Sequence, residues 1–207
     1  MKNVLNLKFI LLLAISSAFL MGCEKDDDDE KSGNNTVVYN GTTYTIKDGL
    51  VNDYGAFDPI DQGENTHYNY DFVVVDDELV QYTEDGYTFW EADTTNASIF
   101  YIYAELFSPG TSSFQTGTFT FKDYEAATAE NIDGEFFFTD AYVGFVKYGD
   151  DEEGYEATGG TIKVSGSNLN YTIEYDLTLP NSKTAKGSFS GTFKYDDNRD
   201  MLLLKKK

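Results

Sequence analysis

The strongest constraint on the fold is an alternation of apolar and polar residues with a period of two near the C-terminus. The apolar or aromatic positions are Leu169, Tyr171, Ile173, Tyr175, Leu177 and Leu179. The residues between them are Asn170, Thr172, Glu174, Asp176 and Thr178. Successive side chains of a strand point to opposite faces, so this pattern is typical of a strand with one face on a core and one in water. It predicts a half-buried strand at residues 169–179.

The flanking segments predict two further strands that form a meander with the first. Residues 161–165 form one of them, and the turn residues 166–168 connect it to the alternating segment. Residues 180–182 predict the second turn, which leads into a strand at 183–195. Earlier strands are expected at residues 37–39, 42–47, 67–75, 79–82, 87–90, 98–107, 117–121 and 136–148. Asn40-Gly41, between the first two, is a strong signal for a hairpin turn. The segment 98–107 is apolar on both faces and is therefore expected to be central, with both faces covered.

These segments predict an all-β fold of about ten strands, either an antiparallel β-sandwich or an up-and-down barrel. Both architectures place alternate residues on a core, so the pattern leaves the choice between them open. One short helix is expected at residues 124–131, with Asp123 as its N-cap and Glu125 in its first turn. The β domain is expected to cover residues 36–207, which is the length of a single domain.

The N-terminus predicts a secretory signal. An apolar run at residues 9–20 follows a basic start and is shorter than the roughly 20 residues of a membrane span. The run ends at Leu20 and Gly22, which stand three residues and one residue before Cys23 and resemble a bacterial lipobox. The single cysteine of the chain occupies the acceptor position. We therefore expect residues 1–22 to be a lipoprotein signal peptide and Cys23 to carry the acyl chains, such as palmitate, that anchor the protein in outer-membrane lipid.

Residues 23–35 are expected to form the lipidated N-terminus and an acidic tether. Lys25, Asp26 and Asp27 lie in an acidic run directly after Cys23, and this run resembles the signal that exports Bacteroidota lipoproteins to the cell surface. An acidic run is also a solvated, self-repelling linker that holds a domain away from anionic headgroups. The two interpretations are compatible, and the first, which we favour, places the β domain at the cell surface on the outer membrane.

The charge of the chain excludes several functions. It has 36 acidic and 15 basic residues, a net charge of −21, and Arg199 is its single arginine. Such a surface repels nucleic acid, and one arginine provides no bidentate phosphate clamp, so no nucleic-acid partner is expected. One cysteine and one histidine can form neither an intrachain disulfide nor a Cys/His zinc site.

No catalytic residue is expected. A Ser-His-Asp triad or a Cys-His dyad would need His67, the single histidine of the chain. His67 begins a predicted strand and is interpreted as a surface or strand-end histidine. A pair of carboxylates could still serve a glycosidase, and Glu105 and Asp140 are the candidates because each follows aromatic residues on one strand face. An acid in an aromatic environment has a raised pKa and can act as a general acid. The favoured interpretation, however, is that both acids face solvent near strand ends, where single acids are ordinary.

Two weaker site hypotheses concern loops. Asp150, Asp151 and Glu153 form an acidic cluster that could supply oxygen ligands to calcium, although a solvated loop tip is the preferred interpretation. No other metal and no organic cofactor is expected. Thr94 lies in Asp93-Thr94-Thr95, which resembles the short acceptor sequence for O-glycosylation in Bacteroidota.

The predicted meander also carries a family resemblance. The segments GGTIKV from Gly159, YTIEYDL from Tyr171 and GSFSGTF from Gly187 resemble the C-terminal meander of small Bacteroidota surface lipoproteins with calycin-like or sandwich-like β domains. This resemblance implies a cell-surface β domain and supplies no established catalytic residues. We therefore expect a non-enzymatic binding or interaction module for a glycan, a protein or another extracellular ligand. The alternatives are a lipocalin-like carrier of a small apolar ligand and, less favoured, a carboxylate-pair glycosidase.

Overall fold

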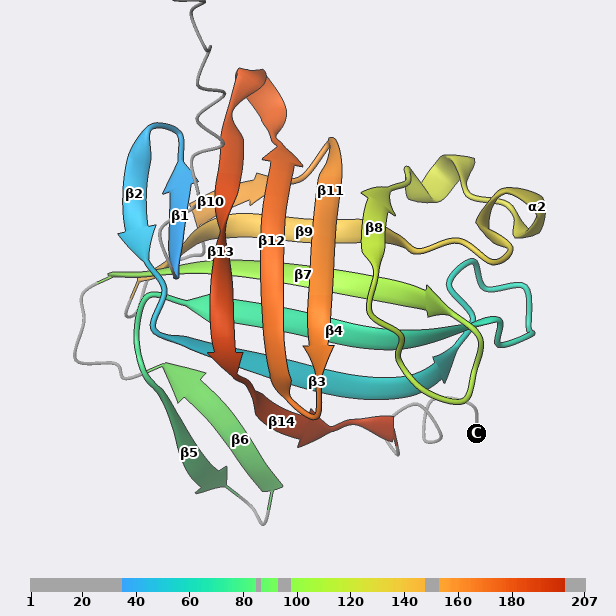
Figure 1. Cartoon of the computed structure of the whole chain (residues 1–207), viewed down its shortest axis with the longest axis horizontal. Helices are drawn as coiled ribbons and strands as arrows, with labels where there is room; N and C mark the ends of the chain where they lie inside the picture. Colours follow the sequence, from blue (N-terminus) through green and yellow to red (C-terminus); the bar gives the residue numbers. More distant parts are fainter. Residues whose placement is uncertain (1–34, 85–86, 93–97, 148–152, 200–207) are drawn as a thin grey trace, which may run out of the picture. The chain divides into compact units, whose positions relative to one another are not determined.

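The described part of the chain is predominantly β with one short α-helix, which confirms the expected all-β class. The computed structural model describes residues 35–84, 87–92, 98–147 and 153–199, all within the compact unit Ser32–Lys207. The strands of the larger, 12-stranded sheet follow the order β14-β3-β4-β7-β9-β8-β11-β12-β13-β1-β2, with β10 paired to β9 (Figure 1). Strands β5 and β6 form a separate two-stranded sheet.

The bounds of the elements are as follows. The strands are β1 (Thr36–Tyr39), β2 (Thr42–Thr45), β3 (Asp48–Phe57), β4 (His67–Val75), β5 (Leu79–Glu84), β6 (Tyr87–Ala92), β7 (Ser98–Pro109), β8 (Thr118–Phe121), β9 (Phe137–Lys147), β10 (Glu153–Glu156), β11 (Gly159–Ser167), β12 (Asn170–Thr178), β13 (Thr184–Thr192) and β14 (Lys194–Asp197). The short helices are η1 (Tyr124–Ala126), α2 (Ala129–Ile132) and η2 (Pro180–Ser182).

The expected meander and the first hairpin are present. Strands β11, β12 and β13 pair antiparallel in sequence order. Asn40 and Gly41, with φ of 48° and 83°, connect β1 to β2 in the conformation that two-residue hairpins favour. The turn between β11 and β12 is formed by Asn168 and Leu169, with φ of 53° and 64°. It therefore lies slightly later in the chain than the turn predicted at residues 166–168.

The large sheet is mixed rather than purely antiparallel, which corrects the expected strand arrangement. Strand β14 pairs parallel to β3, and β8 pairs parallel to β9. The predicted strand at 183–195 ends instead at Thr192, and after Phe193 the chain continues as β14 on the opposite edge of the strand order. Gly49 is required at this crossing, because a Cβ there would lie 2.6 Å from the Phe193 ring.

The sheet curls so that its two halves share one core. Figure 1 shows β11, β12 and β13 crossing in front of β3, β4, β7 and β9 at a steep angle. Phe72 of β4 meets Tyr171 of β12 and Phe193 edge to face, with ring centroids 5.6 and 5.4 Å apart. Such edge-to-face pairs add to the stabilisation from apolar burial. The two halves are therefore held together mainly by large aromatic side chains.

Strand β7 is central and covered on both faces, as its sequence predicted. It lies between β4 and β9, and Phe100 and Ile102 point into the main core. Ile99 and Tyr101 point to the opposite face and pack with Leu79 of β5 and with residues of β6. At the other end of this face, Phe107 packs with Ile132 of α2. The face outside the main core is therefore apolar at both ends, and the site described below lies between them.

The predicted helix is broken in two. Asp123 caps η1 by accepting a hydrogen bond from the Glu125 amide, as expected. Ala127 then adopts an extended conformation, and Thr128 is the N-cap of α2. Within the described residues, no helix has both the length and the apolar character needed to cross a membrane.

Tyr175 gives a test of polar burial in the main core. Within the described part of the chain its hydroxyl has no hydrogen-bond partner, and the side chain belongs to the main cluster. Because a buried hydroxyl without a partner keeps its full desolvation cost, Tyr175→Phe should raise the free energy of unfolding by about 1 kcal/mol. Urea unfolding measures the difference. A loss of stability would contradict the prediction and would indicate that an internal water satisfies the hydroxyl.

Candidate functional site

A row of acidic side chains crosses the face of the sheet opposite the main core. Asp71 of β4 is the register partner of Glu105 on β7 and, on its other side, of Asn52 on β3. Asn52 in turn pairs with Asp196 of β14. Partners on adjacent strands lie about 4.8 Å apart and share a face. We call Asp140, Glu105, Asp71 and Asp196 the acidic row.

Asp140 joins the row through a bulge in β9. Ala104 pairs with Ala141 and Leu106 pairs with Phe138, so Thr139 and Asp140 oppose the single residue Glu105. A bulge of this kind redirects a side chain, and such features are common beside functional sites. The charge of Asp140 acts on both Glu105 and Asp71, which places the three carboxyl groups in one cluster.

The acidic side chains of the row differ in how deeply they are buried. Asp71 is only 5% exposed, and its carboxylate accepts hydrogen bonds from the Tyr103 hydroxyl at 3.1 Å and from Asn69 Nδ2 at 3.3 Å. Glu105 is partly buried, and Asp140 is exposed. No described residue forms a hydrogen bond with the Glu105 carboxyl group. The row therefore leads from a buried, oriented carboxylate to carboxyl groups that reach solvent.

Burial and nearby negative charge raise the pKa values of Glu105, Asp71 and Asp140. Desolvation, followed by the charges of Asp71 and Asp140, raises the pKa of Glu105 to about 8. Desolvation raises the pKa of Asp71 to about 7, although the hydrogen bonds from Tyr103 and Asn69 oppose the rise. The pKa of Asp140 is also raised, by desolvation and then by the nearby Glu156. At neutral pH the cluster therefore holds protons that isolated carboxylates would release.

Tyrosine rings flank the row. Tyr103 and Tyr142 are register partners on β7 and β9, and Tyr142 stacks on Tyr101 with centroids 5.6 Å apart. Tyr54 follows Asn52 by two residues on β3, and burial and then the charges of Asp71 and Glu105 raise its pKa to about 12. The site thus combines acceptor oxygens with aromatic side chains.

Asn69 contributes a buried acceptor beside the row. The residue is 1% exposed, and its Nδ2 donates to Asp71 and to the Leu106 carbonyl. Its Oδ1 has no hydrogen-bond partner among the described residues. A buried carbonyl oxygen without a partner costs stability, and such atoms in native structures occur where water, an ion or a ligand binds.

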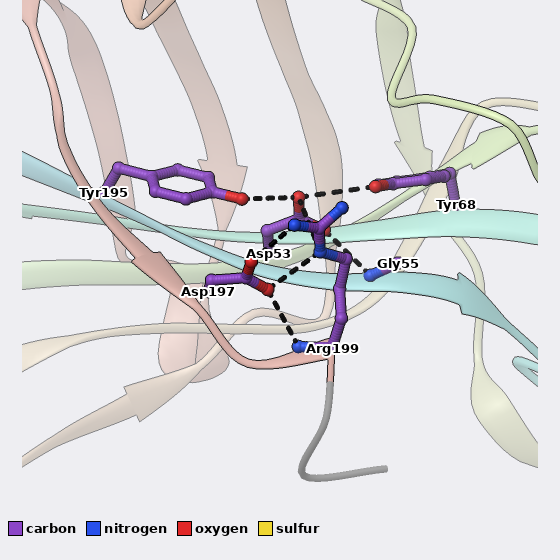
Figure 2. A network of polar contacts seen from close by, with 6 residues as sticks. All are labelled: Asp53, Gly55, Tyr68, Tyr195, Asp197 and Arg199. Carbon is purple, nitrogen blue, oxygen red and sulfur yellow. Dashed lines mark hydrogen bonds and ion pairs between the residues drawn. The ribbon is translucent and has the colours of Figure 1, made fainter. Parts of the chain in front are cut away.

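A second polar network lies on the other face of β3, at the edge of the sheet (Figure 2). Asp53 is 3% exposed and accepts hydrogen bonds from the Tyr195 hydroxyl at 2.8 Å, the Tyr68 hydroxyl at 3.3 Å and the Gly55 amide at 2.9 Å. The Arg199 guanidinium lies 3.9 Å from Asp53 and also binds Asp197. This network joins β3, β4 and β14, and its acceptors are occupied by the protein itself. We therefore interpret it as structural.

The structure brings together some of the residues selected from the sequence. Glu105 and Asp140 lie in one cluster with the buried Asp71, which was not predicted from the sequence. The sequence signal for a buried acid was the position of Asp71 within the apolar segment YDFVVV of β4. Among the described residues no group of three or more His, Cys, Asp or Glu side chains has the geometry of a metal site.

His67 is buried rather than exposed. It begins β4, as a strand-end histidine should, but it is only 1% exposed, which excludes the surface interpretation. Its Nε2 donates to the Glu135 carbonyl at 3.2 Å, so Nδ1 accepts from the Thr66 hydroxyl at 2.8 Å. Desolvation lowers the pKa of the ring, which stays neutral and packs edge-on against Phe137.

Most of the other site residues predicted from the sequence lie outside the described residues. The lipobox and export residues Leu20, Gly22, Cys23, Lys25, Asp26 and Asp27 are outside, as are Thr94, Asp150 and Asp151. Glu153 is described and is the exposed first residue of β10. Comparisons of the chain with protein families, with curated proteins and with solved structures find no match.

Proposed function

We propose that the chain is an outer-membrane lipoprotein whose β domain is displayed at the cell surface and binds an extracellular ligand without catalysing a reaction. The observation that carries the binding proposal is the acidic row, where Asp71, Glu105 and Asp140 form no ion pair with any described lysine or arginine and lie among tyrosine rings on a partly exposed face. Proteins retain such costly groups mainly where they are used. The lipobox at Cys23 and the acidic tether support display outside the cell.

A glycan is the first ligand class to test for this module. Sugar hydroxyls donate to carboxylates, and sugar rings pack on tyrosines such as Tyr103 and Tyr142. A glycan array probed with the fluorescently labelled protein should give signals that weaken in Glu105→Gln and persist in Glu174→Gln, a control on β12 where Glu174 pairs with Lys163. Equal signals from the two variants would contradict binding at the row.

The anchoring proposal makes a separate prediction. Because Cys23 is the single cysteine and follows the lipobox, radiolabelled palmitate should enter the wild-type chain and should be absent from Cys23→Ala. Protease added to intact cells should then degrade the anchored β domain. Continued labelling of the alanine variant would contradict lipidation at Cys23.

A carrier of a small apolar ligand is the second candidate. We infer that the sheet is an incompletely closed barrel, since its strand order continues without interruption from β14 to β2. The unpartnered Tyr175 hydroxyl in the core would be a polar contact for such a ligand. Rings such as Phe72 and Phe193 occupy the interior at contact distance, so a carrier would have to move them. We therefore prefer binding on the outside of the sheet.

A glycosidase is the third candidate, and the carboxyl cluster is what favours it. Glu105, with its raised pKa, has the protonation state of a general acid at neutral pH, and Asp71 is its neighbour. Asp71 is hydrogen-bonded and almost completely buried, which leaves little access for a substrate. Release of reducing sugar by the wild type and its loss in Glu105→Gln would establish this activity in place of simple binding.

A further inference from the structure

We propose that the acidic row binds a linear polyamine, a small organic cation whose successive ammonium groups are separated by short methylene chains. This inference rests on the proposed binding function and specifies its ligand class. The row offers acceptors that reach solvent at Asp140 and Glu105 on neighbouring strands and again at Asp196, three strands beyond Glu105, while the buried Asp71 lies between them and adds negative charge. With strands about 4.8 Å apart, an extended ligand lying across them meets a series of carboxyl groups.

The described part of the chain places no cation beside three of these acids. Among the described residues, no lysine or arginine forms an ion pair with Asp71, Glu105 or Asp140. Carboxylates placed together without a counter-charge repel one another, and a bound cation would relieve that repulsion. The ligand that gains most from the site therefore carries positive charge.

Asn69 is independent evidence that a donor is missing from the site. Its amide binds the Asp71 carboxylate through Nδ2, so its unpartnered Oδ1 lies within the same group of acceptors. The Tyr103 hydroxyl is already committed to Asp71. A ligand that complements this set has to donate hydrogen bonds, and an ammonium group donates three and accepts none.

The tyrosine rings favour an organic ammonium over a bare metal ion. Tyr54 and Tyr103 can pack against methylene groups and attract an ammonium group through their ring faces. Oxygen-binding metals need several ligands in a compact sphere, and no such group occurs among the described side chains. The elongated arrangement of the row fits a chain of charges better than a single point charge.

Binding should strengthen as pH rises through the range from about 7 to about 8. The groups facing the site are Tyr54 and Asp196 from β3 and β14, Asp71 from β4, Tyr103 and Glu105 from β7, Asp140 and Tyr142 from β9, and Glu156 from β10. Asp71 and Glu105 must lose their protons to hold a cation, whereas an alkylammonium of lysine type keeps its proton to about pH 10. Proton release on binding should therefore accompany the association.

Isothermal titration of the purified full-length chain with spermidine tests the proposal. We expect saturable binding that is about tenfold or more weaker in Glu105→Gln and in Asp140→Asn. Both side chains reach solvent, so these variants should fold, and circular dichroism checks that they do. The control Glu174→Gln removes one exposed acid elsewhere and should bind as the wild type does.

Several outcomes would overturn the proposal. One is equal weakening by Glu105→Gln and Glu174→Gln, because it would show general attraction to an acidic surface. Others are tighter binding of a trilysine peptide than of spermidine, or binding of calcium alone with loss in Glu105→Gln. If spermidine does not bind while the glycan array gives signals that depend on Glu105, the polyamine inference fails and the proposed binding function stands.

Discussion

Replacing Asp53 by alanine should lower the free energy of unfolding by about 3–5 kcal/mol, the cost of removing one partner from a buried charged network. The variant leaves the Tyr68 and Tyr195 hydroxyls without their shared acceptor, and it leaves Arg199 without its buried counter-charge. It also weakens the attachment of β14 to β3, which is an edge pairing. Guanidinium or urea unfolding followed by tyrosine fluorescence measures the change.

Two further variants separate the contributions within this network. Tyr195→Phe removes one donor to a charged acceptor at 2.8 Å and should cost about 1.5–3 kcal/mol. Asp197→Ala removes an exposed partner of Arg199 and should cost less than about 1 kcal/mol, as surface ion pairs usually do. If Asp53→Ala cost no more than Asp197→Ala, the network would not hold the edge of the sheet.

The strand positions could be predicted mainly where alternation or a turn signal was strong. The segment at 169–179 and the Asn40-Gly41 hairpin are both present, because local pattern and tertiary packing agree there. Strand β3 was missed, since Gly49, Asn52, Asp53 and Gly55 are poor strand formers. Its neighbours β4 and β14 supply the pairing that its own propensities do not.

The mixed sheet could not be predicted from local pattern. A parallel pairing between β14 and β3 joins segments far apart in the chain, and it depends on how the whole sheet curls. Phe193 gave no signal of a strand end, because it is in phase with Phe189. The break at Phe193 arises from its close packing on Gly49, which only the three-dimensional structure shows.

The acidic row was half visible in the sequence. Glu105 and Asp140 were selected because they follow aromatic residues, and a solvent-facing position near strand ends was the favoured interpretation. What brings them together is the register of β4, β7 and β9 and the bulge opposite Glu105. Register between strands is set by long-range pairing, so a single sequence does not reveal which acids become neighbours.

Raising the pH from about 4 to about 8 should lower the free energy of unfolding by about 4 kcal/mol or more, through Asp71 and Glu105. Both acids have folded-state pKa values above their unfolded values, so the folded chain binds more protons in this range. Their contribution is most favourable below the unfolded pKa and is lost as pH rises through the folded pKa of about 7 for Asp71 and about 8 for Glu105. A rise from 3.8 to about 7 for Asp71 alone corresponds to about 4 kcal/mol.

Comparison with Glu105→Gln isolates this effect from the other titrating groups. His67 and Asp197 have lowered pKa values, so their contribution to the free energy of unfolding decreases as pH falls, which is opposite to that of Asp71 and Glu105. Both residues are unchanged in the variant. The variant should therefore be less sensitive to pH, and its stability relative to wild type should increase from about pH 5 to about pH 8. Chemical unfolding at a series of pH values gives this difference curve. A flat curve would mean that water reaches Glu105 freely in the folded protein, and the repulsion that we expect a cationic ligand to relieve would then be absent.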